Sequence, residues 1–351
     1  MREDTSMTTM GVAVIGAGYW GPNLIRNFLA GPDWDLRWVC DLDEDRARRA
    51  LRHAGGVQVT TDLGQVLDDP DVVAVAVATP AATHTEVVLA ALDAGKHVLV
   101  EKPLAPSLAE GQKLVAAADE RGLVLMCDHT YCYTPAVLKI RELVMSGELG
   151  DVQYVDSVRV NLGLVQPDID VLWDLGPHDL SILDFILPEE MRPSRVAAFG
   201  ADPVGAGHTC VGYLTMPLAG NAVAHVHLNW LSPTKIRTTL IGGSKKMIVW
   251  DDLNPSQRIS VYDRGVELQQ PAEGEARQRA QVAYRLGDMV APTLPEGEAL
   301  QGVVAELAAS IREGRAPLTD GRAGLRVLEL LEAASRSLET GGGFIELEEV
   351  Q

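Results

Sequence analysis

The sequence has little cysteine. Its four cysteines, Cys40, Cys127, Cys132 and Cys210, show no disulfide framework in a chain of 351 residues. Three of them lie in or beside apolar runs, so we expect reduced thiols in the core of a cytoplasmic protein. Cys127, His129 and Cys132 are close in sequence, but no second ligand pair at zinc spacing accompanies them. We therefore predict no metal site.

Long apolar runs and basic residues are also scarce. No apolar run reaches the ~18 residues of a membrane-spanning helix, and the first ten residues, MREDTSMTTM, lack the apolar stretch of a secretory signal. We therefore predict no membrane partner. The 30 Lys and Arg residues stand against 49 Asp and Glu, a net charge of −19. This balance argues against a nucleic-acid partner and favours attraction of a cationic substrate.

A glycine-rich turn follows the first apolar segment. The stretch MGVAVIGAGYWGPNLIRNFLAG reads as a strand, a turn with Gly16, Gly18 and Gly21 in G-x-G-x-x-G spacing, and a helix. The first glycine permits a tight turn, the second lets backbone approach a pyrophosphate, and the third lets the helix pack on the strand. Backbone N–H groups at the helix start can bind the phosphates. The order of strand, turn and helix predicts a dinucleotide site.

Asp41 follows the second predicted strand, WDLRWVC, twenty residues after Gly21. A carboxylate at this place can accept hydrogen bonds from the hydroxyls of the adenosine ribose. It would also repel the 2′-phosphate of NADP, so NAD is the predicted cofactor and NADP is disfavoured. The alternative is that Asp41 only caps the helix predicted to follow, LDEDRARRA.

Strands and helices alternate through the first third of the chain. DVVAVAVA (71–78), HVLVEKP (97–103) and LVLMCD (123–128) read as buried strands, while 83–94 and 107–121 are helical, the latter with Ser107 and Glu110 as a capping box. This alternation predicts an α/β domain over 1–130, with a parallel sheet and helices on both faces. Ligands bind such sheets at the carboxyl ends of the strands, where ATPAATH (78–84) and EKP (101–103) fall.

The pattern changes after about residue 150. Six strand candidates with short turns follow one another: DVQYVDSVRVNLG, PSRVAAFG, HTCVGYLTM, NAVAHVHLNW, KIRTTLIGG and KKMIVWDD. They predict an α+β domain over 131–351 with an open antiparallel sheet, whose C-terminal helices pack back toward the first domain. We assign substrate binding and oligomerisation to it. A neighbour would usefully cover the open sheet face, so we expect a homodimer or homotetramer.

The segment VLWDLGPHDL (171–180) places Asp174 and His178 four residues apart ahead of an apolar run. One interpretation is a helix start, with Pro177 in the first turn and Asp174 favouring the helix dipole. The other is a functional pair: if the helix already runs through Asp174, both side chains lie about one turn apart on one face.

These features together resemble the Gfo/Idh/MocA oxidoreductase family over essentially the whole chain. The matching stretches are GAGYWG (16–21), Asp41, ATPAATH, AGKHVLVEKPLA (94–105), the Asp174/His178 pair and the closing segment 321–341. The stretches LWDLGPHDLSIL and SPTKIRTTLIGGSKKMIVWDD resemble the branch that acts on nucleotide-linked or other amino sugars. Where the family often has Asn-Arg after the LVLMCD strand, this chain reads DHTYCY, which leaves the substrate contacts there open.

The resemblance implies a Rossmann domain joined to an open sheet, with the active site between them. Lys102, Asp174 and His178 are then the predicted catalytic residues. The predicted cofactor contacts are Gly16, Gly18, Tyr19, Trp20, Gly21, Asp41, Thr79, Pro80, His84, Glu101, Lys102 and Pro103. The predicted substrate contacts are Lys102, Tyr131, Arg159, Asn161, Asp174 and His178. Arg159 and Asn161 share a strand face by period-two spacing, and a solvated face is the alternative for them.

The resemblance also implies the chemistry. Oxidising a secondary alcohol needs a hydride acceptor over the carbon and a base on the hydroxyl. A free lysine, with a pKa of about 10.4, becomes such a base when burial and nearby positive charge lower that value. Lys102 is the position the resemblance nominates. Glu101 is expected to orient the loop or the cofactor rather than to transfer protons, and the bond before Pro103 is expected to be cis.

We therefore predict an NAD-dependent sugar dehydrogenase. Its substrate would be an amino sugar, a nucleotide sugar or an aminoglycoside, oxidised at a secondary ring hydroxyl, the 3-hydroxyl being favoured. A ketosugar reductase and an inositol dehydrogenase are close alternatives, because the same residues serve both directions and related polyols. From a different class, a non-catalytic NAD-binding sensor or regulator is the competing hypothesis. The presence of Lys102, Asp174 and His178 argues against that sensor.

Overall fold

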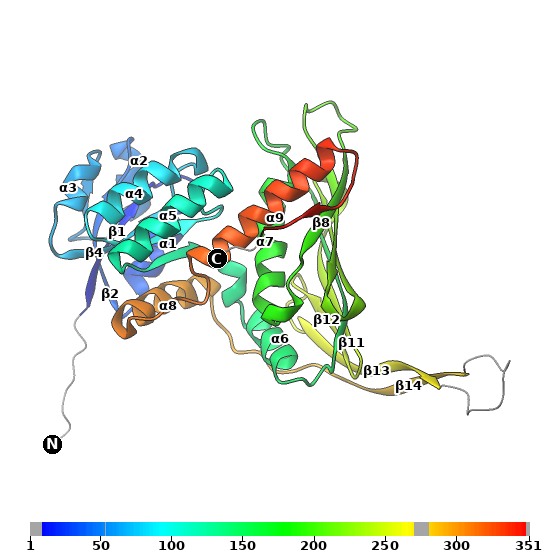
Figure 1. The fold of residues 1–351 in the computed structure, drawn as a ribbon. Helices are drawn as coiled ribbons and strands as arrows, with labels where there is room; N and C mark the ends of the chain where they lie inside the picture. Colours follow the sequence, from blue (N-terminus) through cyan, green and yellow to red (C-terminus); the bar gives the residue numbers. More distant parts are fainter. Residues whose placement is uncertain (1–8, 53, 270–280, 349–351) are drawn as a thin grey trace, which may run out of the picture. The chain divides into compact units, whose positions relative to one another are not determined.

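The computed structural model describes residues 9–52, 54–269 and 281–348, which group into two compact units. The first unit holds the described residues up to Thr134 together with Gly297–Glu329. The second holds Pro135–Glu296 and the described residues from Leu330 onward, so the division falls inside helix α9, Gly321–Glu339. Each unit contains its own sheet (Figure 1).

The first unit contains a six-stranded sheet in the order β3-β2-β1-β4-β5-β6, with every neighbouring pair parallel. Its strands are β1 (Met10–Ile15), β2 (Trp34–Cys40), β3 (Gln58–Thr60), β4 (Val72–Val77), β5 (His97–Glu101) and β6 (Leu125–Asp128). The central strand β4 reads VVAVAV and is almost wholly buried, as expected when helices cover both faces of a parallel sheet. The predicted parallel α/β domain is confirmed.

The helices of the first unit form two groups (Figure 1): α4 packs beside α5, and α1 packs beside α2 and α8. Their bounds are α1 (Gly21–Ala30), α2 (Glu44–Leu51), α3 (Leu63–Leu67), η1 (Ala81–Thr83), α4 (His84–Asp93), α5 (Leu108–Arg121), η2 (Thr130–Tyr133) and α8 (Ala299–Glu313). The Ser107 side chain accepts a hydrogen bond from the Glu110 N–H, the first half of the predicted capping box. Gly111 in α5 faces Leu325 and Leu328 of α9, where an added Cβ would lie 2.8 Å from each.

The second unit contains a nine-stranded sheet in the order β14-β13-β12-β11-β7-β10-β9-β8-β15. Its elements are α6 (Pro135–Met145), β7 (Val152–Leu162), α7 (Val171–Ile186), η3 (Glu189–Met191), β8 (Arg195–Ala201), β9 (Val211–Leu218), η4 (Ala219–Asn221), β10 (Ala222–Asn229), β11 (Leu231–Gly243), β12 (Met247–Asp251), β13 (Ile259–Gln269), β14 (Gln281–Val290) and β15 (Ile345–Glu346). The α+β prediction is confirmed with one correction: β7 and β10 are parallel, so the sheet is mixed. The chain between them passes through α7, and such a crossover is what parallel neighbours require.

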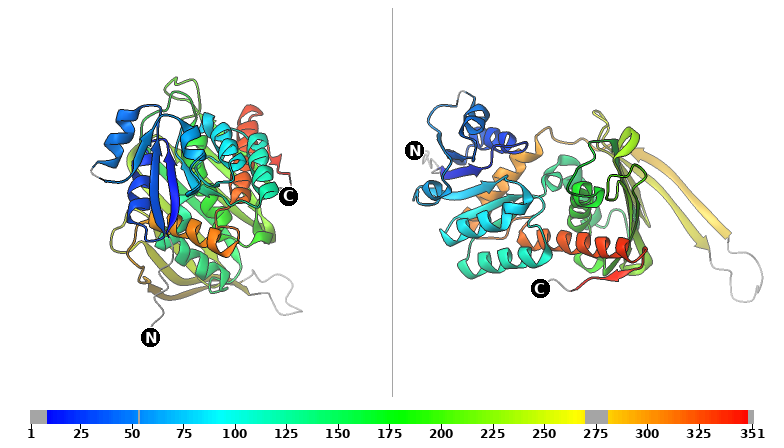
Figure 2. Two further views of the ribbon diagram at one scale, coloured as in Figure 1. Left: turned by 90° about the vertical axis from the view of Figure 1, so that its left-hand side faces the viewer. Right: turned by 90° about the horizontal axis from the view of Figure 1, so that it is seen from above.

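One face of this sheet is covered and the other is open. Alternate residues of β9 and β10 are buried, and α7 packs on β10 and β7. The register places Phe199, Tyr213, Val223 and Leu240 together on the other face, where each is at least 38% exposed. The β13–β14 hairpin, yellow to orange in Figure 2, extends beyond the rest of the sheet.

Candidate active site

The glycine turn has the geometry that its spacing predicts. Gly16 has φ +95°, and a Cβ there would lie 2.7 Å from backbone of Ala78 at the end of β4. A Cβ on Gly21 would lie 2.1 Å from the carbonyl oxygen of Gly16, whereas nothing lies within 4 Å of one on Gly18. Tyr19 is 95% exposed. The turn is therefore tight at its first and third glycines and open at its second, which suits the approach of a pyrophosphate.

Asp41 is tied to the glycine turn. Its carboxylate accepts a hydrogen bond from the Ala17 N–H (2.7 Å) through Oδ2 and one from the Asp43 N–H (2.8 Å) through Oδ1. Capping of α2 belongs to Asp43, whose side chain accepts from the Arg46 N–H. Because each carboxylate oxygen has two acceptor positions, Asp41 can brace the turn and still accept from a ribose hydroxyl.

His84 joins the other two predicted cofactor segments. Its Nδ1 lies 2.8 Å from the Pro103 carbonyl oxygen and its Nε2 lies 2.9 Å from that of Thr79. Burial lowers the pKa of His84, and the two carbonyl contacts act in the opposite direction. The neutral ring can donate to only one carbonyl at a time. His84 therefore holds the 78–84 loop against the EKP loop, whose Lys102–Pro103 bond is cis as expected. Pro80 precedes η1 at the same loop.

Two carboxyl groups end neighbouring strands beside Lys102. Glu101 ends β5 and pairs in register with Asp128, which ends β6. Asp128 is buried and accepts hydrogen bonds from Trp20 Nε1 (3.1 Å) in the glycine turn and from Thr130 Oγ1 (2.7 Å). Burial, and then the charge of Asp128, raise the pKa of Glu101 to about 8. Sequence reasoning missed Asp128, because its place opposite Glu101 depends on the strand register.

Helix α7 carries Asp174 and His178 in the second unit. The helix begins after Asp170, whose side chain accepts from the N–H groups of Leu172 and Trp173, and Pro177 lies inside it. The interpretation of Pro177 as a first-turn residue is therefore wrong, since the cap is seven residues earlier. Asp174 and His178 are one turn apart on a continuous helix, as the functional interpretation requires.

Asp174 is oriented by a residue that sequence reasoning missed. Trp230, between β10 and β11, donates its Nε1–H to Asp174 Oδ2 at 2.9 Å, and its side chain is 1% exposed. A tryptophan at the end of an alternating strand gives no sequence signal for this contact. His178 is half-buried, and its carbonyl oxygen accepts from Ser181 Oγ.

Arg159 does not have the place expected for a sugar contact. It is 3% exposed, and its Nε lies 2.5 Å from Asp179 Oδ2 beneath α7. Period-two spacing identified its face of β7 correctly but could not show that α7 covers it. Asn161, on the same strand, is only partly buried, as is Tyr131 in η2 of the first unit.

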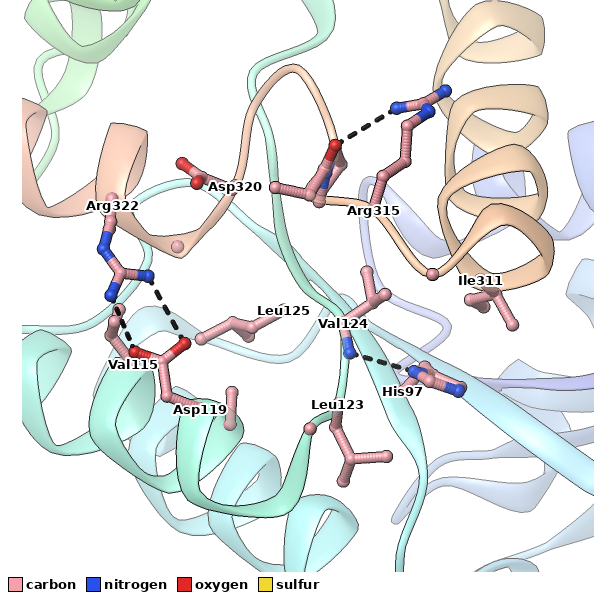
Figure 3. Close-up of a pocket in the computed structure, with 16 residues that line it drawn as sticks. His97, Val115, Asp119, Leu123, Val124, Leu125, Ile311, Arg315, Asp320 and Arg322 are labelled. Atoms are coloured by element: carbon pink, nitrogen blue, oxygen red, sulfur yellow. Dashed lines mark hydrogen bonds and ion pairs between the residues drawn. The ribbon is translucent and has the colours of Figure 1, made fainter.

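A cavity of about 280 Å³ lies elsewhere in the first unit (Figure 3). His97 and Leu125, the first residues of β5 and β6, line it, so it lies at the amino ends of the strands and away from the glycine turn. Its Arg322 is bonded to Asp119, and His97 Nδ1 accepts from the Val124 N–H. It is not the predicted site. Among the described residues no group of three or more His, Cys, Asp and Glu could hold a metal ion, and no helix is long and apolar enough to cross a membrane.

The first unit therefore fits a dinucleotide at the carboxyl ends of β1, β4 and β5. An open Gly18, a carboxylate after β2 and a lysine after β5 are the parts that a dinucleotide-dependent oxidoreductase needs. Comparison with known proteins agrees. Residues 10–129 match the oxidoreductase family with an NAD-binding Rossmann fold, and residues 137–249 match the Gfo/Idh/MocA C-terminal domain. The chain belongs to the Gfo/Idh/MocA family of NAD(P)-dependent oxidoreductases, as the resemblance predicted.

Three relatives illustrate the range of this family. UDP-N-acetylglucosamine 3-dehydrogenase GnnA from Acidithiobacillus ferrooxidans has a TM-score of 0.78 at 26% identity, over 95% of this chain and 99% of that one. GenD2 from gentamicin A biosynthesis, solved with NAD, has a TM-score of 0.78 at 28% identity, over 97% of both chains. Inositol 2-dehydrogenase 2 from Saccharopolyspora erythraea is 34% identical over 188 residues, which are 52% of this chain and 55% of that enzyme. That alignment spans only about half of the inositol enzyme.

Proposed function

We propose that the protein is an NAD-dependent dehydrogenase that oxidises a secondary ring hydroxyl, the 3-hydroxyl, of an amino sugar, nucleotide sugar or aminoglycoside. The observation that carries this proposal is the group of Gly18, Asp41 and Lys102 at one edge of the first unit's sheet. The full-length similarity to a UDP-N-acetylglucosamine 3-dehydrogenase and to GenD2 supports the substrate class. The net charge of −19 favours a cationic aminoglycoside within that class.

Bound NAD would accept the hydride from the carbinol carbon. Lys102 would take the hydroxyl proton on its Nζ, with His178 hydrogen-bonded to the reacting oxygen and Asp174 orienting the sugar. Tyr131 and Asn161 are the further candidates for sugar contacts. The same groups would serve a ketosugar reductase in reverse. Oxidation of an inositol is the second candidate, and the 34% identity to an inositol 2-dehydrogenase favours it.

Titration of the protein with NAD and with NADP tests the proposed preference for NAD. We expect tighter binding of NAD than of NADP, because the Asp41 carboxylate would repel a 2′-phosphate. Asp41→Asn keeps an oxygen for the Ala17 N–H but removes the charge, so the preference for NAD should fall by roughly tenfold or more, which corresponds to about 1.4 kcal/mol. Asp45→Asn removes an equal charge from the exposed surface of α2 and should leave the preference unchanged. Equal affinity of the wild type for both cofactors would contradict the role of Asp41.

A turnover assay with NAD then separates the substrates. The panel contains nucleotide-linked amino sugars, aminoglycosides and inositols, and reduction of NAD is followed by absorbance. If the protein turned over inositols and none of the sugars, it would be an inositol dehydrogenase and the proposed sugar substrates would be wrong.

A further inference from the structure

The two carboxyl groups beside Lys102 are close neighbours. Glu101 and Asp128 are register partners at the ends of adjacent parallel strands. Adjacent strands lie about 4.8 Å apart, and register partners project from the same face of a sheet. Asp128 is 1% exposed and Glu101 is only partly exposed, so little water separates the two groups.

The hydrogen bonds suit an ionised Asp128. Trp20 Nε1–H donates to one of its oxygens and Thr130 Oγ1–H to the other. Glu101 has the backbone N–H of Lys102 as a hydrogen bond that favours its ionised form. Two adjacent buried carboxylates repel one another, and the pair relieves this repulsion by holding one proton. These hydrogen bonds stabilise a negative charge on Asp128 more than one on Glu101, so we expect the shared proton to lie on Glu101.

The surrounding charges agree with this assignment. Burial and the Asp128 charge raise the pKa of Glu101 to about 8, while the Lys102 charge acts against both. Burial also raises the pKa of Asp128, against the hydrogen bonds from Thr130 and Trp20 and the Lys102 charge. The other titratable groups that interact with the pair are Cys127, which interacts with both carboxyl groups, and Tyr133, which interacts with Asp128. Burial raises the pKa of both the Cys127 thiol and the Tyr133 hydroxyl well above their ordinary values, so both are neutral near pH 8.

We propose that Glu101 and Asp128 hold one proton between them and that Glu101 exchanges it with Lys102. The carboxyl pair then receives the proton that Lys102 takes from the substrate hydroxyl. The inference rests on the proposed function of Lys102. It also revises the expectation that Glu101 only orients the loop or the cofactor, because the strand register places Asp128 opposite Glu101.

The exchange balances. During oxidation the hydroxyl O–H breaks and an N–H forms on Lys102, giving the ammonium. An ammonium N–H then breaks, an O–H forms on the Glu101 carboxylate, and Lys102 returns to the amine. Glu101 later releases this proton to water. Accepting the proton requires an ionised Glu101, which prevails above about pH 8. Below that pH Glu101 holds the proton and can return it to Lys102 in the direction of reduction.

Infrared titration of the full-length, cofactor-free protein tests the pair directly. A protonated carboxyl group gives a C=O stretching band that the carboxylate lacks. In the wild type we expect such a band at pH 7 that disappears with a midpoint near pH 8. Glu101→Gln should remove this band. Glu86→Gln, which removes an exposed carboxyl group of α4, is the matched control and should leave it unchanged.

Two further variants test the coupling. Asp128→Asn removes the like charge but keeps an oxygen for Trp20 or Thr130, so the midpoint should fall by roughly one to three pH units. Lys102→Met removes the opposite charge, so the midpoint should rise by roughly one unit. A wild type without a band that titrates above pH 6, or a band that survives in Glu101→Gln, overturns the shared proton. A midpoint that does not move in Lys102→Met overturns the exchange.

This experiment needs neither substrate nor cofactor. If the band and its shifts are found in a protein that oxidises no sugar, the proposed function fails and the carboxyl pair stands. If turnover is found, the pH profile of kcat for oxidation should rise through the same midpoint. Glu101→Gln should lose that rise.

Discussion

Side chains at the strand ends of the first unit have different partners and therefore different roles. Asp41 and His84 are bound to backbone and connect loops. Asp128 accepts hydrogen bonds from Trp20 and Thr130 and is the register partner of Glu101 on the neighbouring strand. In the proposed reaction Lys102 takes the proton of the substrate hydroxyl. A single substitution of Lys102 should therefore impair catalysis without impairing cofactor binding.

Lys102→Ala should lower turnover by about two to four orders of magnitude, the range for loss of general acid–base catalysis. NAD affinity should change little, because the glycine turn and Asp41 are the proposed main cofactor contacts. His178→Ala should lower turnover less, since water or Asp174 can partly substitute, and the double variant should be far from additive. Lys113→Ala, at an exposed position of α5, is the control and should turn over normally. Near-normal turnover of Lys102→Ala on the true substrate would remove Lys102 from the mechanism.

Local sequence predicted the residues whose role depends on local geometry. The close approach of Gly21 to Gly16 and the Ser107 cap depend on neighbours within a few positions. The close approach of Gly16 to Ala78 joins two strand ends, and the cis bond before Pro103 was expected from the family resemblance. Asp128 and Trp230 were missed because their partners, Trp20 and Asp174, are 108 and 56 positions away. Arg159 was misplaced because burial under α7 depends on which face of the sheet the helix covers.

Helix α7 shows how an element fixes the site residues that it carries. Asp170 caps its start, Trp173 Nε1 donates to Ser335 of α9, and Trp230 holds Asp174. Further along, Asp179 accepts from Ser157 Oγ (2.7 Å) and from Arg159, both on β7. These polar anchors on successive turns set the rotation of α7 over the sheet, and hence the direction of His178.

The buried Arg159–Asp179 pair allows a direct test at this scale. Arg159→Met leaves the buried Asp179 carboxylate without the guanidinium that pairs with it and should reduce the free energy of unfolding by about 3–5 kcal/mol. Arg159→Met combined with Asp179→Leu removes both charges and should recover most of that loss. Urea unfolding of the two single variants and the double variant measures the coupling. Additive losses would show that the pair does not act as a unit.

Element order was predicted more fully than sheet membership. The parallel sheet of the first unit follows from strict alternation of strand and helix, and six strands of the second unit were placed from their period-two pattern. The strands β13, β14 and β15 and the helix α6 were not predicted. No described side chain of β14 is buried, so β14 lacks the buried alternation that marked the other strands, and β15 has only two residues. The parallel β7–β10 pair could not be predicted, because pairing partners are not encoded in the periodicity of either strand.

The whole molecule combines a strongly acidic chain with an exposed apolar sheet face. Phe199, Tyr213, Val223, Ile236 and Leu240 lie on that face, each at least 38% exposed. Tyr213 stacks on His225 and His227 of the neighbouring strand. An apolar face that spans several strands marks an interaction surface, and a second copy of the chain is the occupant that we predict.

Light scattering should accordingly give the mass of a dimer or tetramer. Leu240→Glu places a charge within the apolar face at a side chain that is 38% exposed, so the fold should tolerate it while the measured mass falls toward that of the monomer. Leu138→Glu, at a 41% exposed position of α6 in the helical layer, is the control and should leave the mass unchanged. Because each copy carries a net charge of −19, salt should strengthen the association by screening the repulsion between copies. A clean monomer at working concentration in high salt would contradict the prediction, and equal loss of mass in both variants would place the interface elsewhere.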